Sequence, residues 1–426
     1  MITEPAELDD AIEVLRAGTG PIAVDTERAS GYRYGQRAFL IQLAREGSGT
    51  FLIDPIPFGD LTHLGEALAG AEWILHAASQ DLPCLAEIGM RPRTLFDTEL
   101  AGRLAGFARV GLGSMVELML GVSLEKAHSA ADWSRRPLPA EWLLYAALDV
   151  ELLVRLRNAL DAELRAQGKR DWAAEEFAAL IAADPLAVRP GEPWRRTSGM
   201  HQVHGRRQLA TVRELWLARD DVARDMDLAP GRVLPDMAIV AAALKQPSDV
   251  ATFTRLPGAG NRTARAHAPR WVAAVAAAAA VPEEELPVLR VETDGPPPPH
   301  RWSDRDPIAA GRLERARAAV LALAEELRLP AENLIPPDAV RRLAWQPPSA
   351  VDADSVAEAL GSAGARGWQV GLTAGPLSDA LNAPPTPKSV AEAAVAPAAE
   401  EGPAVDGPKG ADPGVTDGET GNAPIA

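Results

Sequence analysis

Over the first 185 residues, hydrophobic and polar positions alternate between strand-like and helix-like patterns. After a capped helical stretch at 3–15, short apolar stretches bounded by turn residues predict four strands, at 21–27, 38–44, 50–53 and 72–76. Helical periodicity predicts six further helices, at 61–68, 81–88, 97–104, 113–120, 140–165 and 171–182. Three strands, a helix, another strand and then helices predict a mixed α/β sheet with helical cover.

From residue 186 onward the pattern predicts helices and no strands, with the clearest helices at 202–226 and 308–327. Closely spaced X-Pro pairs beginning at Asp184 mark one linker, and the four prolines 296–299 predict a second, stiff and extended one. No fixed-period repeat indicates a solenoid. The predicted division is an α/β domain at 1–185, a linker at 186–201, a helical domain at 202–285, a proline-rich linker at 286–302, a second helical domain at 303–382 and a tail at 383–426.

The composition, 47% hydrophobic and 24% charged, is that of a globular protein. The acidic tail at 383–426 is the exception, because it contains no Trp, Phe, Tyr or Leu, and we expect it to be disordered. The alanine-rich apolar run at 275–281 is far shorter than the roughly 20 residues of a membrane span, and no secretory signal follows Met1. We therefore expect a cytoplasmic protein without a membrane partner, and we predict no stable protein partner. The single cysteine, Cys84, excludes an internal disulfide and a multi-cysteine zinc site.

The net charge of −16 argues at first against a polyanionic partner. Divided by segment, however, residues 1–185 carry −11 and the tail carries −5, whereas residues 186–287 carry +3. Six arginines at 189–213 share their stretch with one acid, Glu192. Such a cluster can pair with phosphates, and Arg206 and Arg207 are candidate contacts; the alternative is a solvated linker or helix face.

Two acids stand in the first predicted strand. Because strand side chains alternate between faces, Asp25 and Glu27 project from the same face. Two like charges on a core strand repel each other unless a cation lies between them, so the pair suits a divalent metal ion. The alternative is a strand end that frays into solvent with both acids hydrated.

Two further signals involve acids. Asp81 follows the strand at 72–76 in the run His76-Ala-Ala-Ser-Gln-Asp81, at a strand-to-helix junction, where an ordinary acid at a helix start is the alternative. Tyr145 and Asp149 are four residues apart and so share one helical face, which is also typical of a plain amphipathic helix. Taken singly these signals are weak.

Together, the four acids arise on elements that could converge at one end of a sheet. Two divalent ions about 4 Å apart need this many oxygen ligands. Such ions would activate a water for in-line attack on phosphorus and stabilise the leaving 3′ oxygen. Because a phenol with its normal pKa near 10 is a poor base at neutral pH, we expect Tyr145 to orient that water.

These motifs resemble a known family. Asp25-Thr26-Glu27, Asp81 in His-Ala-Ala-Ser-Gln-Asp-Leu, and Tyr145-x3-Asp149 are similar to the three exonuclease motifs of the DEDD superfamily, and the tyrosine is typical of its DEDDy branch. Three stretches resemble bacterial ribonuclease D, namely those beginning at Asp97 (DTELA), Asp132 (DWSRRPL) and Tyr145 (YAALDV). Residues 202–280 resemble an HRDC domain, with Leu-Trp-Leu-Ala-Arg-Asp at 215–220, and 303–382 is assigned as a second, divergent HRDC-like unit by position.

The resemblance implies an α/β ribonuclease-H-like 3′–5′ exonuclease domain followed by all-α HRDC-type helical domains. It implies two divalent ions, Mg²⁺ or Mn²⁺, held by the four acids, with Tyr145 in the catalytic set. It further implies 3′→5′ hydrolysis of RNA that releases nucleoside 5′-monophosphates, with tRNA precursors or other structured RNA with a free 3′ end as the partner. The alternatives are a DNA-directed or dual-specificity exonuclease and a non-catalytic HRDC nucleic-acid-binding protein. A helicase is disfavoured because the chain contains no G-x-x-x-x-G-K-[ST] loop.

Other residues near the motifs are candidate substrate contacts. Arginine suits phosphate geometry, although pairing with the many acids of this domain is the alternative. Tyrosines alternate with arginines after the first motif, where they could stack on a base or belong to a plain hairpin loop. A histidine that closes an apolar strand is more often a buried, hydrogen-bonded residue, and Gln42 is expected to be one near the site. The candidate contacts are Thr26, His76, Arg135, Arg136, Tyr32, Tyr34, Arg206 and Arg207.

Overall fold

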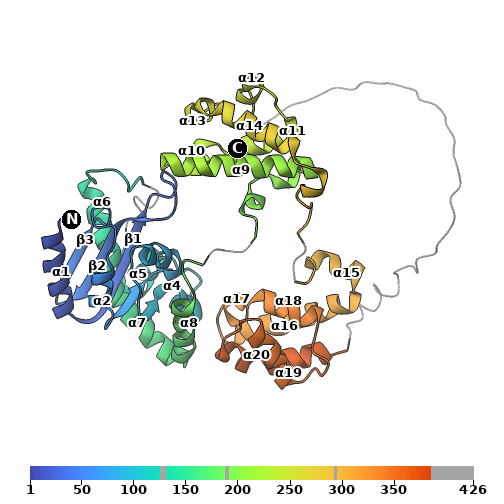
Figure 1. The fold of residues 1–426 in the computed structure, drawn as a ribbon. Coiled ribbons are helices and arrows are strands. Elements are labelled where there is room, and N and C mark those ends of the chain that lie inside the picture. The colour runs from blue at the N-terminus through green and yellow to red at the C-terminus, as the bar shows by residue number, and fades with distance from the viewer. Residues whose placement is uncertain (125–130, 188–190, 292–294, 385–426) are drawn as a thin grey trace, which may run out of the picture.

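The computed structural model describes residues 1–124, 131–187, 191–291 and 295–384. The described chain forms an α/β body followed by two helical groups (Figure 1). The predicted tail lies almost wholly outside the described residues, as does Arg189 of the arginine cluster. Within the described ranges, no helix combines the length and the apolar character that a membrane crossing requires.

A single five-stranded sheet forms the centre of the α/β body, with the strand order β3-β2-β1-β4-β5. β1 runs antiparallel to β2, and β2 antiparallel to β3, whereas β4 lies parallel to β1 and β5 parallel to β4. The mixed sheet confirms the predicted fold class. Its strands are β1 (Thr19–Arg28), β2 (Ala38–Glu46), β3 (Gly49–Ile53), β4 (Glu72–Leu75) and β5 (Thr94–Asp97).

Helices cover the sheet because its central strand is apolar over Ile22–Val24 and completely buried there. The helix α6 packs across β1, β2 and β3, and α7 packs across β1 and β4. The helices of this body are α1 (Pro5–Ala17), α2 (Thr62–Ala67), η1 (Ala78–Gln80), α3 (Leu82–Glu87), α4 (Thr98–Leu104), α5 (Leu112–Leu120), α6 (Ala140–Glu151), α7 (Leu153–Ala166) and α8 (Arg170–Ala182).

Two elements of this body differ from the sequence prediction. The strand β5 was not expected, because four residues at the edge of a sheet leave only a short apolar signal, Leu95-Phe96. The single helix expected at 140–165 is two helices, since the α-helix breaks at Leu152. The break lets α6 follow β1 to β3 while α7 turns toward β4, α4 and α5.

The first helical group has its own hydrophobic core, centred on Leu215, Ile239, Phe253 and Trp271. Its longest helix, α9, packs against α11 and α14. The elements are η2 (Pro193–Arg196), η3 (Met200–Gln202), α9 (Arg206–Met226), α10 (Pro230–Val233), α11 (Asp236–Lys245), α12 (Val250–Thr254), α13 (Arg262–Ala266), α14 (Ala268–Ala280) and η4 (Glu283–Glu285).

The second helical group packs on the α/β body, and the two share one hydrophobic core. The ring of Trp368 on α20 stacks on that of Trp172 on α8, with centroids 5.0 Å apart and planes 10° apart. Lys169 Nζ donates to the carbonyl oxygens of Leu104 and Arg328 across the same contact. The elements are η5 (Pro299–Arg301), α15 (Trp302–Arg305), α16 (Pro307–Glu326), α17 (Ala331–Leu334), α18 (Pro337–Trp345), α19 (Ala353–Ser362) and α20 (Gly367–Asn382).

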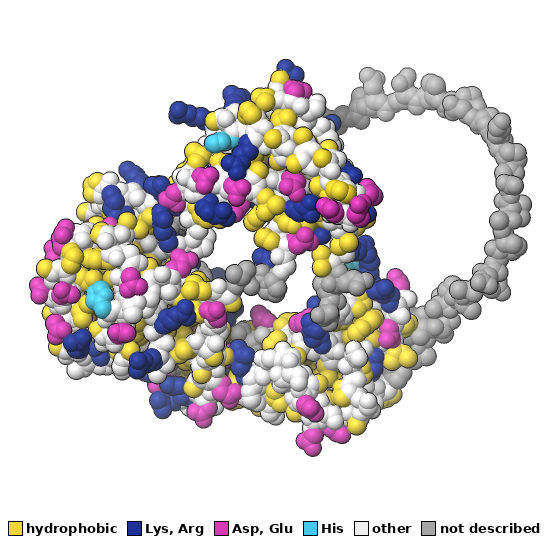
Figure 2. All heavy atoms as spheres, in the orientation of Figure 1, with side chains coloured by type: hydrophobic (Ala, Val, Ile, Leu, Met, Phe, Trp, Pro, Cys, Tyr) yellow, Lys and Arg dark blue, Asp and Glu magenta, His cyan; other side chains and the backbone are white. Residues whose placement is uncertain are grey.

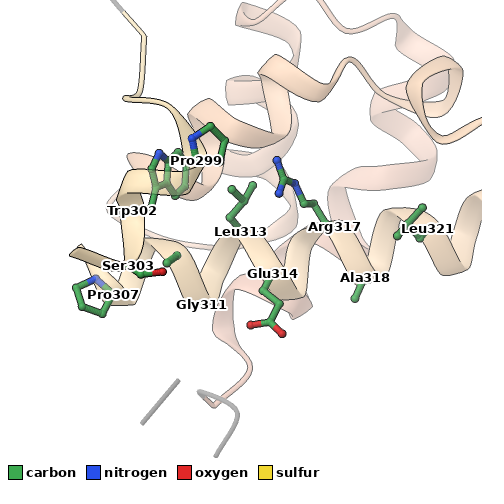
Figure 3. A pocket seen from close by; sticks show the side chains of 11 residues that line it. Pro299, Trp302, Ser303, Pro307, Gly311, Leu313, Glu314, Arg317, Ala318 and Leu321 are labelled. Carbon is green, nitrogen blue, oxygen red and sulfur yellow. The ribbon is translucent and has the colours of Figure 1, made fainter. Parts of the chain in front are cut away.

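The extended spacer predicted at 286–302 ends earlier than expected. Pro299 begins the 3₁₀ turn η5, and Trp302 is fully buried, with its ring centroid 4.8 Å from that of Trp345. A pocket of about 370 Å³ lies along α15 and α16 beside Trp302 (Figure 3). None of the predicted catalytic residues lines this pocket.

Candidate active site

Three of the predicted ligands meet at one place. Asp25 and Glu27 come from the second half of β1 and Asp149 from α6, and one carboxylate oxygen of each lies within 4.8 Å of the others. The strand alternation places Asp25 and Glu27 on the face that α6 covers, as the sequence pattern predicted. Oxygen atoms this close suit a hard divalent cation.

Asp81 lies beside this group but not within it. It follows η1 at the start of α3, is only 4% exposed, and accepts a hydrogen bond of 2.6 Å from the hydroxyl of Thr26. The guanidinium of Arg28 is 3.7 Å from the same carboxylate. Thr26, on the opposite face of β1 from the acid pair, therefore holds Asp81 at the edge of the sheet, where its charge acts on Asp25 and Glu27.

The four carboxyl groups all have raised pKa values. Burial, followed by repulsion from the neighbouring acids, raises the pKa of Asp25 well above its ordinary range and that of Glu27 to about 9. Burial also raises the pKa of Asp81 and that of Asp149 to about 6. Buried like charges need protons or a cation, so the donor set fits divalent metal ions of the Mg²⁺ or Mn²⁺ type.

Tyr145 shares a face of α6 with Asp149, as the four-residue spacing predicted. Its hydroxyl hydrogen-bonds the Asp149 carboxylate. Burial and the nearby negative charges of Asp149 and Glu27 raise the pKa of the phenol above its ordinary value. Tyr145 therefore keeps its proton at neutral pH, which supports an orienting role over that of a base.

Asp97 organises the strand-to-helix junction that carries Asp81. Its carboxylate accepts hydrogen bonds from the backbone N–H of Ala77 and of Ala78, at 3.1 and 2.9 Å, and also caps α4. Ala77 has a φ of 60°, a left-handed conformation that these bonds stabilise. Asp97 was not among the predicted site residues, although an acid between an apolar stretch and a helix is a recognisable N-cap signal.

His76 fits the structural alternative weighed for it. Its Nδ1 hydrogen-bonds the hydroxyl of Thr98 at 2.9 Å, and burial lowers the pKa of the imidazole to about 4, so the ring is neutral. Arg136 is likewise engaged within the protein, since it donates to Asp54 at 2.6 Å and to the carbonyl oxygen of Phe39. Arg135 is exposed and lies over the ring of Trp142, 5.9 Å from its centroid.

The loop at 29–37, between β1 and β2, reaches the first helical group at α9 and α10 (Figure 1). Arg232 lies over the ring of Tyr32, 4.2 Å from its centroid, and its Nε donates to Gly31 O at 2.6 Å. The hydroxyl of Tyr34 donates to Asp220 at 3.1 Å, and the ring joins the core of that group. Tyr34 thus contributes to the contact between the domains.

A pocket of about 390 Å³ opens beside the carboxylates. Unlike Tyr34, Tyr32 lines this pocket, together with Thr26 and Glu27. The remaining lining is mostly polar, from Arg28, Ser30, Gly31, Gln36, Gln80 and Ala131. Of the candidate substrate contacts, Thr26 and Tyr32 are therefore the two that the structure brings to this pocket.

Arg206 and Arg207 lie at the start of α9, away from these carboxylates. The guanidinium of Arg206 donates to Leu286 O and that of Arg207 to Ala278 O, and both pair with Glu283. Their pairing stabilises the end of α14 and the turn after it. The face drawn in Figure 2 shows basic and acidic side chains interspersed. For Arg206 and Arg207 these contacts favour the helix-face alternative over a phosphate contact.

A mixed sheet that presents converging carboxylates beside a helix-borne tyrosine defines a ribonuclease-H-like 3′–5′ exonuclease domain. The model of a family described as "3'-5' exonuclease" matches residues 1–165. Ribonuclease D of Gluconacetobacter diazotrophicus is 32% identical over 305 residues, which cover 70% of this chain and 76% of that protein. Ribonuclease D of Jannaschia sp. is 34% identical, covering 69% and 78%. The chain belongs to the ribonuclease D family and is a ribonuclease D-type 3′–5′ exonuclease.

The helical groups also have counterparts. The HRDC domain model matches residues 208–275, which confirms the HRDC expectation for the first group. A family described as "3' to 5' exonuclease C-terminal domain" matches residues 295–381, and the HRDC-like assignment of that group stays a prediction. The crystal structure of Escherichia coli RNase D has a TM-score of 0.63 at 27% identity, covering 85% of this chain and 98% of that one. A protein from Bifidobacterium adolescentis has a TM-score of 0.81 at 38% identity, covering 90% and 97%.

Proposed function

We propose that this chain is a two-metal 3′→5′ exoribonuclease that removes nucleoside 5′-monophosphates from the 3′ end of RNA. The observation that carries the proposal is the convergence of Asp25, Glu27 and Asp149 with the protonated hydroxyl of Tyr145 beside them. Asp81 completes the acidic set from the adjoining junction.

The roles of the residues follow from their chemistry. Asp25, Glu27, Asp149 and Asp81 would hold the divalent ions, Mg²⁺ or Mn²⁺. When bound, the ions supply activation of the attacking water and stabilisation of the leaving 3′ oxygen. Tyr145 positions that water through its hydroxyl, which stays protonated because burial and the acids raise the pKa of the phenol. Thr26 orients Asp81 by donating a 2.6 Å hydrogen bond to it.

The substrate is proposed to be structured RNA with a free 3′ end, such as a tRNA precursor. Two observations support this choice: the relatives are named ribonuclease D, and the E. coli protein is described as an exoribonuclease involved in structured RNA processing. The pocket beside Glu27 is lined by Ser30, Gln36 and Gln80, whose side chains can hydrogen-bond a ribose hydroxyl. Hydroxyl and amide groups of this kind favour RNA over DNA, the alternative substrate.

A gel assay on 5′-labelled RNA with Mg²⁺, Mn²⁺ or EDTA tests the direction and the cofactor. We expect a ladder that shortens from the 3′ end only with metal. The variants Asp25→Asn and Asp149→Asn should lose hydrolysis while still binding RNA, and the exposed Asp9→Asn serves as the control. Unaffected hydrolysis in the first two variants would remove the metal assignment, and faster turnover of a matched DNA oligonucleotide would replace RNA with DNA.

A further inference from the structure

Gln42 is a buried amide in the middle of β2. The residue is 0% exposed, and neither Nε2 nor Oε1 has a hydrogen-bond partner among the described residues. A buried polar group without a partner lowers stability, because the hydrogen bonds it made to water in the unfolded chain are not replaced. An apolar side chain of similar size would not carry this cost, so the amide calls for an explanation.

The register of the sheet places Gln42 next to the acidic group. Gln42 is the cross-strand partner of Asp25, and partners in an antiparallel pair project from the same face. Their Cβ atoms are therefore about 5 Å apart. On its other side Gln42 pairs with Leu52 of β3, which gives the amide no polar neighbour there.

The helix α6 covers this face of the sheet. Leu40, two residues from Gln42 on the same face, packs in one cluster with Ala146 of α6, and Leu52 and Tyr145 lie against that cluster. The amide is thus enclosed between an apolar layer, the helix and Asp25. The carboxylates at this end of the sheet are the hydrogen-bond acceptors that the register brings nearest to Nε2.

We propose that Gln42 is a positioning residue for the metal ligand Asp25. With the ion bound, its Nε2 would donate to a carboxylate oxygen of Asp25, its cross-strand partner, and so fix the orientation in which Asp25 holds the metal. Ligands of metal ions commonly have such a supporting hydrogen bond from a neighbouring side chain, and its loss weakens metal binding by about 10- to 100-fold. The inference rests on the proposed metal-dependent function, since it assigns Gln42 a role only when the ion is bound.

The test replaces Gln42 with methionine, which has similar length and no hydrogen-bonding amide. In EDTA, Gln42→Met should melt at the same temperature as the parent protein or higher, because the amide has no partner to lose. In Mn²⁺ titrations followed by calorimetry, its affinity should fall about tenfold or more. The rise in melting temperature on adding Mn²⁺ should shrink accordingly.

Gln167 provides the matched control. Its Nε2 donates to Ala105 O at 3.0 Å and to Glu163 at 2.7 Å, on the α7 side of the body. Gln167→Met should therefore lower the melting temperature in EDTA and leave the Mn²⁺ affinity unchanged. The opposite responses of the two variants separate a metal-linked role from a purely structural one.

Four outcomes would contradict the proposal, and they can be told apart. If the parent protein does not bind Mn²⁺, the proposed function fails; if the parent binds Mn²⁺ and Gln42→Met binds it equally well, only the role of Gln42 fails. A Gln42→Met variant that is destabilised in EDTA would show that the amide is already bonded, for instance to a buried water, which also overturns the proposal. Should that variant not fold, exchange of the Gln42 side-chain amide protons in the parent protein decides: Mg²⁺ is expected to slow it, and unchanged exchange would refute the proposal.

Discussion

Burial and repulsion from the neighbouring acids raise the pKa of Glu27, so the residue destabilises the metal-free protein and replacing it with glutamine should stabilise that form. In the unfolded chain Glu27 loses its proton near its ordinary pKa of 4.5, whereas in the folded protein the pKa is about 9. Because the folded value is the higher one, the unfolded state binds fewer protons between these two pH values. Folding stability therefore falls as the pH rises through this window.

The magnitude follows from the two pKa values. Each pH unit inside the window lowers the free energy of unfolding by about 1.4 kcal/mol, so at pH 7 the penalty from Glu27 is about 3 kcal/mol. Because Glu27 is only 9% exposed, screening by solvent reduces this penalty little. Glutamine has nearly the same shape and no ionisable proton, so Glu27→Gln in EDTA should gain about 3 kcal/mol at pH 7 and little near pH 4.5.

Urea unfolding measured by circular dichroism between pH 5 and pH 8 checks this. The pH slope of stability should be shallower in Glu27→Gln than in the parent protein, and unchanged in the exposed control Glu117→Gln. With saturating Mg²⁺ the parent protein should become the more stable of the two, because its Glu27 carboxylate binds the ion and the variant lacks this carboxylate. A variant that is no more stable in EDTA at pH 7, or that retains the parent slope, would refute the argument from burial and repulsion.

Three further predictions follow from the contacts around the site. Tyr145→Phe should reduce the single-turnover rate by about 10²-fold with Mn²⁺ affinity retained, and an unchanged rate would contradict the orienting role. Arg232→Ala removes the cation–π contact with Tyr32, worth about 1 kcal/mol, and should raise KM for RNA about fivefold with kcat maintained. An unchanged KM would show that the loop at 29–37 keeps its conformation without this contact from the HRDC domain. Trp368→Ala loses the stack on Trp172 and should cost about 3 kcal/mol, measurable as faster proteolysis of the second helical group.

Local periodicity predicted the shared faces of the two residue pairs of the proposed site because each spacing lies within a single element. Asp25 and Glu27 are two residues apart on one strand, and Tyr145 and Asp149 are four apart on one helix, so each pair shares a face in any fold that keeps the element. Their convergence depends on the order of the strands in the sheet, which no local pattern predicted and which the structure shows. Gln42 was expected to be buried and hydrogen-bonded near the site; it is buried, but no partner is described for it.

What local patterns could not predict depends on contacts distant in sequence. Tyr34 meets Asp220 across 186 residues of chain, so nothing around Tyr34 indicates that its hydroxyl is engaged. Arg206 and Arg207 look like a basic patch because their partner Glu283 lies more than 70 residues away. The end of the helix at Leu152 likewise has no proline or glycine to mark it, since the packing of α6 and α7 on different strands determines it.

The core shared by the α/β body and the second helical group has a consequence for how the chain is divided. Residues of α8 and α20, separated by the whole HRDC domain, belong to one hydrophobic cluster, whereas the HRDC domain has a core of its own. In folding terms the HRDC domain is therefore an insertion within a discontinuous domain. Ending the chain after the HRDC domain would remove the second helical group and expose the apolar surface of the exonuclease body that it covers. Excising the HRDC domain and rejoining the flanking segments would instead leave the core of that body intact.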